Sequence, residues 1–201
     1  MNRRRTAAAD DGFTLLETIV ALGIVGTVLA SLAAFFVRSE TVQHQQADTQ
    51  IAAQIASNSM DYVSQLPGDN VLLGRTQTAV QAEWQAPGAS TYLDPARTEP
   101  AWPDPALPVS SSVQGLPTTP ETIQMTADAT PYQRWWYVGS CWQATTGGDC
   151  VVVPSSQRSQ YVHMYRIVVV ITWPSPNCTD SRCQYVATML TESTLADPIW
   201  E

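Results

Sequence analysis

The sequence predicts an α+β fold in which a long N-terminal α-helix packs on a C-terminal antiparallel β-sheet headpiece. Three observations support this prediction. Residues 13–37 form an apolar run, no proline or glycine occurs between Gly26 and Pro67, and residues 134–201 are rich in aromatic and β-branched side chains. The first half of the helix is expected to be transmembrane.

Length and charge limit the possible functions. A chain of 201 residues with one apolar segment near its start has room for a membrane element and one modest soluble domain. The net charge is −8 and the chain contains no lysine, so we expect no direct binding to nucleic acid. Its 14 prolines and its charged fraction of 14% are typical of a loop-rich β domain outside the cytoplasm.

The N-terminal part divides into a leader and a membrane segment. Residues 1–12 are polar and include Arg3, Arg4 and Arg5, which the positive-inside rule places in the cytoplasm. Residues 13–37 contain one ionisable side chain, and a helix of this length rises about 37 Å, enough to cross a hydrocarbon core of about 30 Å. We therefore expect a single-pass protein of the cytoplasmic (inner) membrane with its C-terminal domain outside.

Residues 38–66 are predicted to continue the helix as an amphipathic half. Apolar side chains recur at helical spacing on one side, and polar side chains cover most of the rest. The apolar side consists of Ile51, Ile55, Tyr62 and Leu66, with Ala52 and Val63 beside them. Pro67 and Gly68 are typical of a helix end.

Residues 67–133 are predicted to be a proline-rich loop region. We expect a strand around residues 76–84, and the prolines follow in residues 85–133. Prolines at this density exclude long helices and central strands.

Residues 134–201 are predicted to form the sheet, with strands at 134–142, 160–173 and 184–191. Alternate residues of the second strand share one face. We expect this face to pack on the apolar side of the helix, through Tyr165, Ile167, Val169, Ile171 and Trp173.

All four cysteines lie in the sheet region, and an even number confined to one region is typical of an oxidising compartment. Three pairings are possible, and the two local bonds, Cys141 to Cys150 and Cys178 to Cys183, form the favoured set. The alternative is four unpaired buried thiols. The spacing does not match a zinc ribbon.

Other residue types favour packing over chemistry. His44 and His163 lie in no metal-ligand pattern, and no nucleophile–base motif or phosphate-binding loop occurs. We therefore predict no metal, no cofactor and no enzymatic activity. Four tryptophans of the predicted sheet could form a ligand-binding surface, although strand aromatics more often fill a core: Trp135, Trp136, Trp142 and Trp173.

The segment Gly12-Phe13-Thr14-Leu15-Leu16-Glu17 resembles the processing site of type IV pilins and of the pseudopilins of related secretion and DNA-uptake machines. The resemblance in detail covers about residues 1–40 and rests on a short basic leader, the glycine, the phenylalanine, an early glutamate and an uninterrupted apolar helix. The helix-then-sheet order also looks like the family's headpiece. The stretch from VVVITWPS through the last two cysteines to YVATML is similar to minor pilins of the PilV-like type.

This resemblance implies a specific fate for the chain. A prepilin peptidase would cut after Gly12 and N-methylate Phe13, and an assembly platform in the membrane would add the mature chain to other pilin subunits. The implied product is a structural, minor subunit of a type IV pilus or pilus-like filament, located in the pilus or at the cell surface after assembly. One alternative is a pseudopilin of a type II secretion or DNA-uptake system. Another is a single-pass anchored extracellular binding domain that does not polymerise.

Glu17 is the predicted assembly residue. A carboxylate among lipid tails costs several kcal/mol, and cleavage would create an α-amino group on Phe13, one helical turn away, with an ordinary pKa of about 8. A slipped neighbouring helix would leave one of these charges unpaired, so the pair would select the register of assembly. The alternative is that Glu17 reaches the lipid headgroups at the edge of an ordinary signal anchor. Thr14 and Thr18 are expected to bond back to helix carbonyls.

Overall fold

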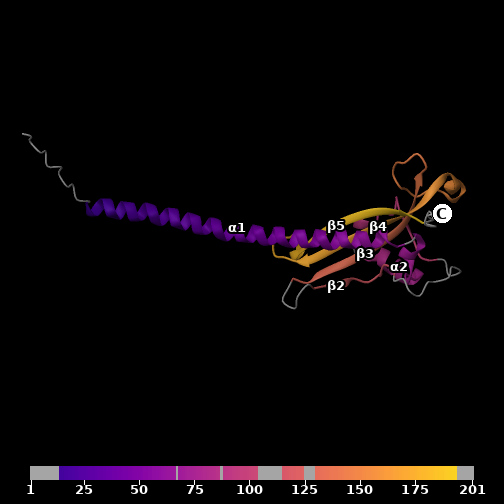
Figure 1. Cartoon of the computed structure of the whole chain (residues 1–201), viewed down its shortest axis with the longest axis horizontal. Helices are drawn as coiled ribbons and strands as arrows, with labels where there is room; N and C mark the ends of the chain where they lie inside the picture. Colours follow the sequence, from indigo (N-terminus) through magenta and orange to yellow (C-terminus); the bar gives the residue numbers. More distant parts are fainter. Residues whose placement is uncertain (1–13, 67, 87, 104–114, 125–129, 194–201) are drawn as a thin grey trace, which may run out of the picture. The chain divides into compact units, whose positions relative to one another are not determined.

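The computed structural model describes residues 14–66, 68–86, 88–103, 115–124 and 130–193. The chain divides into two compact units, Met1–Asp48 and Thr49–Glu201. The boundary lies inside the helix α1, which runs from Leu15 to Ser64 (Figure 1). No proline interrupts this segment, and the sequence places Pro67 shortly after its last turn, where proline prevents the helix from continuing.

The second unit contains one antiparallel sheet. Its strands are β1 (Glu99–Pro100), β2 (Glu121–Ile123), β3 (Tyr132–Ala144), β4 (Tyr161–Pro174) and β5 (Arg182–Glu192). The strand order is β1-β3-β4-β5, and β2 also pairs with β3. The three long strands, side by side in Figure 1, confirm the predicted α+β class. The strands β3 and β5 extend one or two residues beyond each predicted end, and β4 begins and ends one residue later than predicted.

One face of the sheet packs on the last part of α1. Ala52, Ile55, Ala56 and Val63 are buried in one cluster with the β4 residues predicted for this face. Tyr62 was expected on the same side, and this prediction is wrong, because Tyr62 is 40% exposed. The buried positions instead include the small side chains of Ala56 and Ser59.

The opposite face of the sheet is partly covered by short helices from the proline-rich region. These helices are α2 (Gln77–Gln85) and α3 (Ala89–Tyr92). Elsewhere in the chain, 3₁₀ turns occur at Gly68–Leu72, Ser155–Gln160 and Thr179–Ser181. Ala89 and Leu93 are buried against Val168 and Val170 of β4 and Tyr137 of β3.

The strand expected around residues 76–84 is therefore wrong. Thr76 caps the N-terminus of α2, since its hydroxyl accepts a hydrogen bond from the Ala79 N–H at 3.2 Å. Such a cap satisfies a backbone donor that a helix start leaves open. In agreement with the proline density, α3 is a single turn and β1 and β2 are only two and three residues long.

A buried arginine anchors the segment that leads into β2. Arg75 is fully buried, forms an ion pair with Glu83 of α2, and donates from Nη1 to the carbonyls of Leu116 (3.1 Å) and Pro117 (3.2 Å). Burial raises the pKa of Glu83 to about 7, and the neighbouring guanidinium offsets part of that rise. Burial also lowers the pKa of Arg75 from its ordinary value.

Two disulfides cross-link the sheet region. Cys141 is bonded to Cys150 and Cys178 to Cys183, with Cα–Cα distances of 5.4 and 5.1 Å. The structure therefore has the local pairing rather than four free thiols. The second bond closes the turn between β4 and β5.

Candidate assembly site

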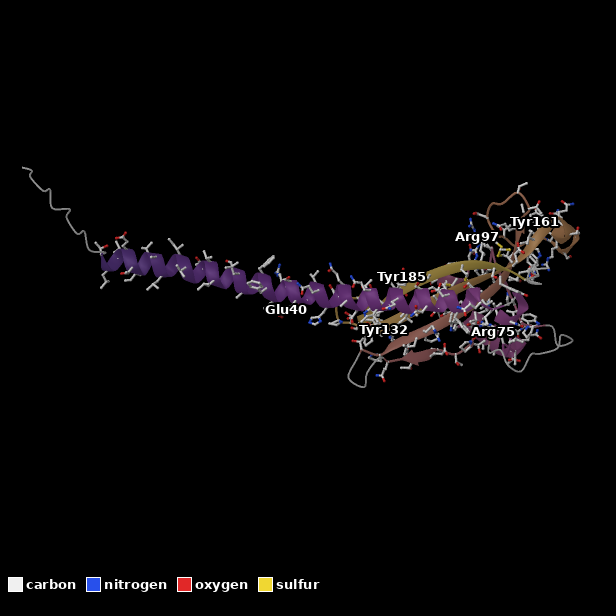
Figure 2. The ribbon with its side chains drawn as sticks, in the orientation of Figure 1. Glu40, Arg75, Arg97, Tyr132, Tyr161 and Tyr185 are labelled. Carbon is white, nitrogen blue, oxygen red and sulfur yellow. A yellow bond between two sulfur atoms is a disulfide. The ribbon has the colours of Figure 1, made fainter. Side chains whose placement is uncertain are left out.

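The first half of α1 exposes an apolar surface on all its sides. Every residue from 14 to 38 is solvent-exposed, and Figure 2 shows the side chains pointing outward around the ribbon. Thirteen of them are large and apolar: Leu15, Leu16, Ile19, Val20, Leu22, Ile24, Val25, Val28, Leu29, Leu32, Phe35, Phe36 and Val37. Among the described residues, α1 is the one helix long and apolar enough to cross a membrane.

Glu17 lies in the first turn of this helix, and it is exposed. Its backbone N–H donates to Oγ1 of Thr14 at 3.3 Å, so Thr14 acts as the N-cap of α1. The carbonyls to which the Thr14 hydroxyl was expected to bond back lie outside the described residues. Thr18 does bond back, because its hydroxyl donates to the Leu15 carbonyl at 2.9 Å.

The electrostatic setting of Glu17 comes from the helix itself. A carboxylate in the first turn interacts favourably with the positive end of the helix dipole, which contributes about 0.3–1 kcal/mol at an exposed site. The next ionisable residues along the helix are Arg38 and Glu40, about 30 Å away at the standard helical rise. Within the described part of the chain, no ion pair forms with Glu17. Glu17 is therefore the one charged side chain among residues 14–37, and it lies in the first turn of α1.

The other predicted site residues fall into two groups. Gly12 and Phe13, the predicted cleavage and methylation site, lie outside the described residues. The four cysteines are brought together as the two disulfides. Among the described residues, which include His44 and His163, no group of three or more His, Cys, Asp or Glu side chains is placed to hold a metal ion.

Sequence reasoning missed the capping role of Thr14, although a signal was present. Thr14-Leu15-Leu16-Glu17 has the Ser/Thr-x-x-Glu spacing of a capping box, which is typical of a helix start. This pattern gives Glu17 a local role in addition to any role in assembly.

Sequence reasoning also missed a polar network that joins α1 to the sheet. Arg134 of β3 donates from Nη1 to the Ser59 hydroxyl and from Nε to the carboxylate of Glu121, both at 3.0 Å. Trp136 Nε1 donates to the same carboxylate at 3.1 Å. No local pattern signals this network, because its members are far apart in the sequence.

A long apolar N-terminal helix that contacts a C-terminal antiparallel sheet is a pilin-like architecture. The apolar helix indicates a membrane anchor or a signal, and the two disulfides indicate an extracytoplasmic domain. Comparisons with protein-family models, with curated proteins and with solved structures gave no match.

Proposed function

We propose that this chain is a structural, minor subunit of a type IV pilus or pilus-like filament, and that it assembles through the first half of α1. In this proposal a prepilin peptidase cuts after Gly12 and methylates Phe13. The observation that carries the proposal is the placement of Glu17, the single charged residue in the exposed, apolar stretch of α1 from residue 15 to residue 37.

The exposed apolar surface supports a role in lipid and in protein packing. Each large apolar side chain contributes about 1.5–3 kcal/mol when it is removed from water. For thirteen such side chains the total is on the order of 20–40 kcal/mol. This segment therefore favours a bilayer before assembly and the packed helices of a filament core afterwards.

Glu17 supports assembly because a charge in that environment needs a partner. The cost of a carboxylate at the centre of a membrane helix is about 2.5–3.5 kcal/mol on insertion scales. Cleavage after Gly12 supplies an α-amino group four residues away, and methylation leaves that amine cationic. In a bundle of such helices, the amine of one subunit pairs with Glu17 of the next, and a slipped register leaves both charges unpaired in a low dielectric.

The first test is the intact mass of the chain recovered from sheared filaments of a cell that expresses it at its native level. The expected species begins at Phe13 and carries one methyl group. A filament that contains the chain with residues 1–12 still attached would contradict the proposal, since the cationic partner of Glu17 would then be missing. A chain that keeps residues 1–12 and stays out of filaments would favour an anchored domain that does not polymerise.

The second test replaces Glu17 by alanine. The matched control is Glu40→Ala, which removes an exposed carboxylate from the same helix beyond the apolar segment. We expect both variants to be cleaved, and we expect Glu17→Ala alone to reduce the amount of subunit in sheared filaments by at least about tenfold. This factor corresponds to about 1.4 kcal/mol, less than the expected cost of an unpaired charge. Equal incorporation of the two variants would remove Glu17 from the mechanism.

A further inference from the structure

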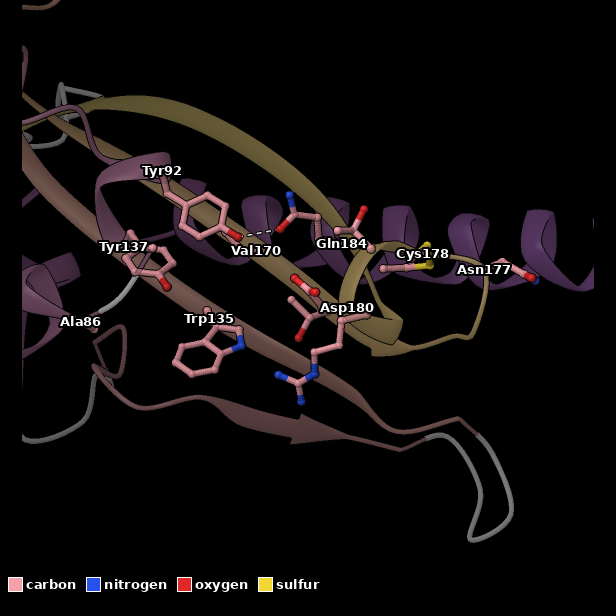
Figure 3. A pocket seen from close by; sticks show the side chains of 14 residues that line it. Ala86, Tyr92, Trp135, Tyr137, Val170, Asn177, Cys178, Asp180 and Gln184 are labelled. Atoms are coloured by element: carbon pink, nitrogen blue, oxygen red, sulfur yellow. Dashed lines mark hydrogen bonds between the residues drawn. A yellow bond between two sulfur atoms is a disulfide. The ribbon is translucent and has the colours of Figure 1, made fainter.

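A groove opens on the face of the sheet that points away from α1, beside the β4–β5 turn (Figure 3). Its volume is about 960 Å³, which lies in the range of about 300–1,000 Å³ that small-molecule sites occupy. We call it the β4–β5 groove. Its lining includes Tyr92, Trp135, Tyr137, Asp180, Arg182 and Gln184.

The sheet register explains why aromatic rings line one side of the groove. Trp135 pairs with Val170, and two residues further along β3, Tyr137 lies on the same face. Tyr92 of α3 stacks on Tyr137 with ring centroids 5.0 Å apart. Trp135 is partly exposed, unlike the buried Trp136, Trp142 and Trp173, so the sequence expectation of core packing holds for three of these four tryptophans.

The opposite side of the groove is polar and comes from the disulfide-closed turn. Figure 3 shows Asp180 and Gln184 across from the three aromatic rings. Gln184 accepts a hydrogen bond from the Tyr92 hydroxyl at 2.6 Å through Oε1, which leaves its amide nitrogen as a donor. Asp180 and Ser181 have φ values of 55° and 54°, a left-handed conformation that is uncommon outside glycine and is often found at functional sites.

The lining selects for a particular ligand chemistry. One carboxylate, Asp180, and one guanidinium, Arg182, are its charged groups, so their charges cancel and the groove has no preference for a strongly charged ligand. The aromatic faces carry a negative quadrupole that attracts polarised C–H groups. The polar side offers acceptors and donors together. A ligand that matches all three features is neutral, has one C–H-rich face and carries hydroxyls at its edge.

A sugar ring has this construction, and we propose that the β4–β5 groove binds a neutral saccharide. One ring lies on Trp135, with its edge hydroxyls bonded to Asp180 and Gln184. The turn is held in place by the Cys178–Cys183 bond, so the polar groups are ordered before the ligand arrives. Binding here involves only the sheet-containing unit and does not depend on filament assembly.

The test uses the full chain in a zwitterionic detergent, because detergents with sugar headgroups would compete. The probes are the neutral trisaccharides of glucose, galactose, mannose and N-acetylglucosamine, and titration calorimetry measures their affinity. We expect at least one probe to bind saturably with one site per chain. Trp135→Ala should weaken that binding at least about tenfold, and Trp102→Ala, which removes a 38% exposed tryptophan outside the groove, should change it less than about twofold.

A second variant guards against a folding defect in Trp135→Ala. Asp180→Asn lies in an exposed turn and keeps a residue type that tolerates the left-handed conformation. It should weaken binding about three- to tenfold, because an amide is a poorer acceptor than a carboxylate. The proposal is overturned if none of the four probes saturates, if binding survives in both variants, or if a proline-rich peptide binds this groove in place of the sugars.

Discussion

Replacing Glu83 by leucine should destabilise the sheet-containing unit by about 3–5 kcal/mol. The side chain of Arg75 is 0% exposed and that of Glu83 is 6% exposed, so the two charges are removed from water together. Leucine would leave the guanidinium buried with only the Leu116 and Pro117 carbonyls as partners. Removing one member of a buried ion pair costs about 3–5 kcal/mol, because arginine keeps its charge at every accessible pH.

Urea unfolding of the full chain in detergent micelles measures this loss, with near-ultraviolet circular dichroism of the tryptophans as the signal. In thermal unfolding of a chain of this size, each kcal/mol of lost stability lowers the Tm by about 2–4 °C. The expected decrease in the Tm of Glu83→Leu is therefore about 6–20 °C. The matched control is Glu83→Gln, which keeps an oxygen acceptor for Arg75. Because burial already raises the pKa of Glu83 to about 7, a neutral group is tolerated there, and we expect a loss of only about 1 kcal/mol.

The double variant Arg75→Leu/Glu83→Leu tests whether the two residues act as a pair. Its loss should be about 1–3 kcal/mol smaller than the sum of the two single losses, since it leaves neither charge unpaired. Additive losses would show that Arg75 and Glu83 do not act as a pair. Equal losses for Glu83→Leu and Glu83→Gln would show that Arg75 requires the carboxylate charge and that an oxygen acceptor alone does not replace it.

Three further predictions follow from local geometry. Thr14→Ala should weaken the first turn of α1 by about 0.5–2 kcal/mol and speed hydrogen exchange at the Glu17 amide, while the headpiece amides stay unchanged. Replacing Cys141 and Cys150 by serine should lower the free energy of unfolding by about 2–4 kcal/mol in the same urea assay, through the added freedom of the unfolded chain. Burial raises the pKa of Tyr137 from its model-compound value of 10.0 to about 12. The folded state therefore holds that phenolic proton longer than the unfolded state, and stability should fall as the pH rises from about 10 to 12. Tyr137→Phe should reduce this slope, and Tyr92, whose pKa burial also raises, should account for a part that remains.

Local periodicity allowed several elements to be predicted from the sequence. The apolar run of residues 13–37 and the lack of helix breakers before Pro67 predicted α1, since both are properties of neighbouring residues. Alternation in residues 160–173 predicted which face of β4 would meet the helix, because a strand places every second side chain on one side. Cysteines only five and nine residues apart were likewise paired by proximity along the chain.

Two predictions failed, one at a local capping signal and one at a tertiary contact. The segment before Trp84 has no strong pattern, and the Thr76 cap made it a helix rather than a strand. Tyr62 lies at helical spacing from Ile55, but the buried side of the helix includes Ser59, which accepts a hydrogen bond from Arg134 of β3.

The sequence by itself determined that this protein has a membrane-length helix with one early carboxylate, followed by a disulfide-linked β domain. Periodicity, charge and spacing are properties of residues that are close together in the sequence, so these features can be predicted without knowledge of tertiary contacts. Only the tertiary structure decided that Arg75 would be buried beside Glu83, and that Trp135 would line a groove with Asp180 and Gln184. Those groups meet because strands and helices far apart in the chain pack together, and no local pattern records such contacts.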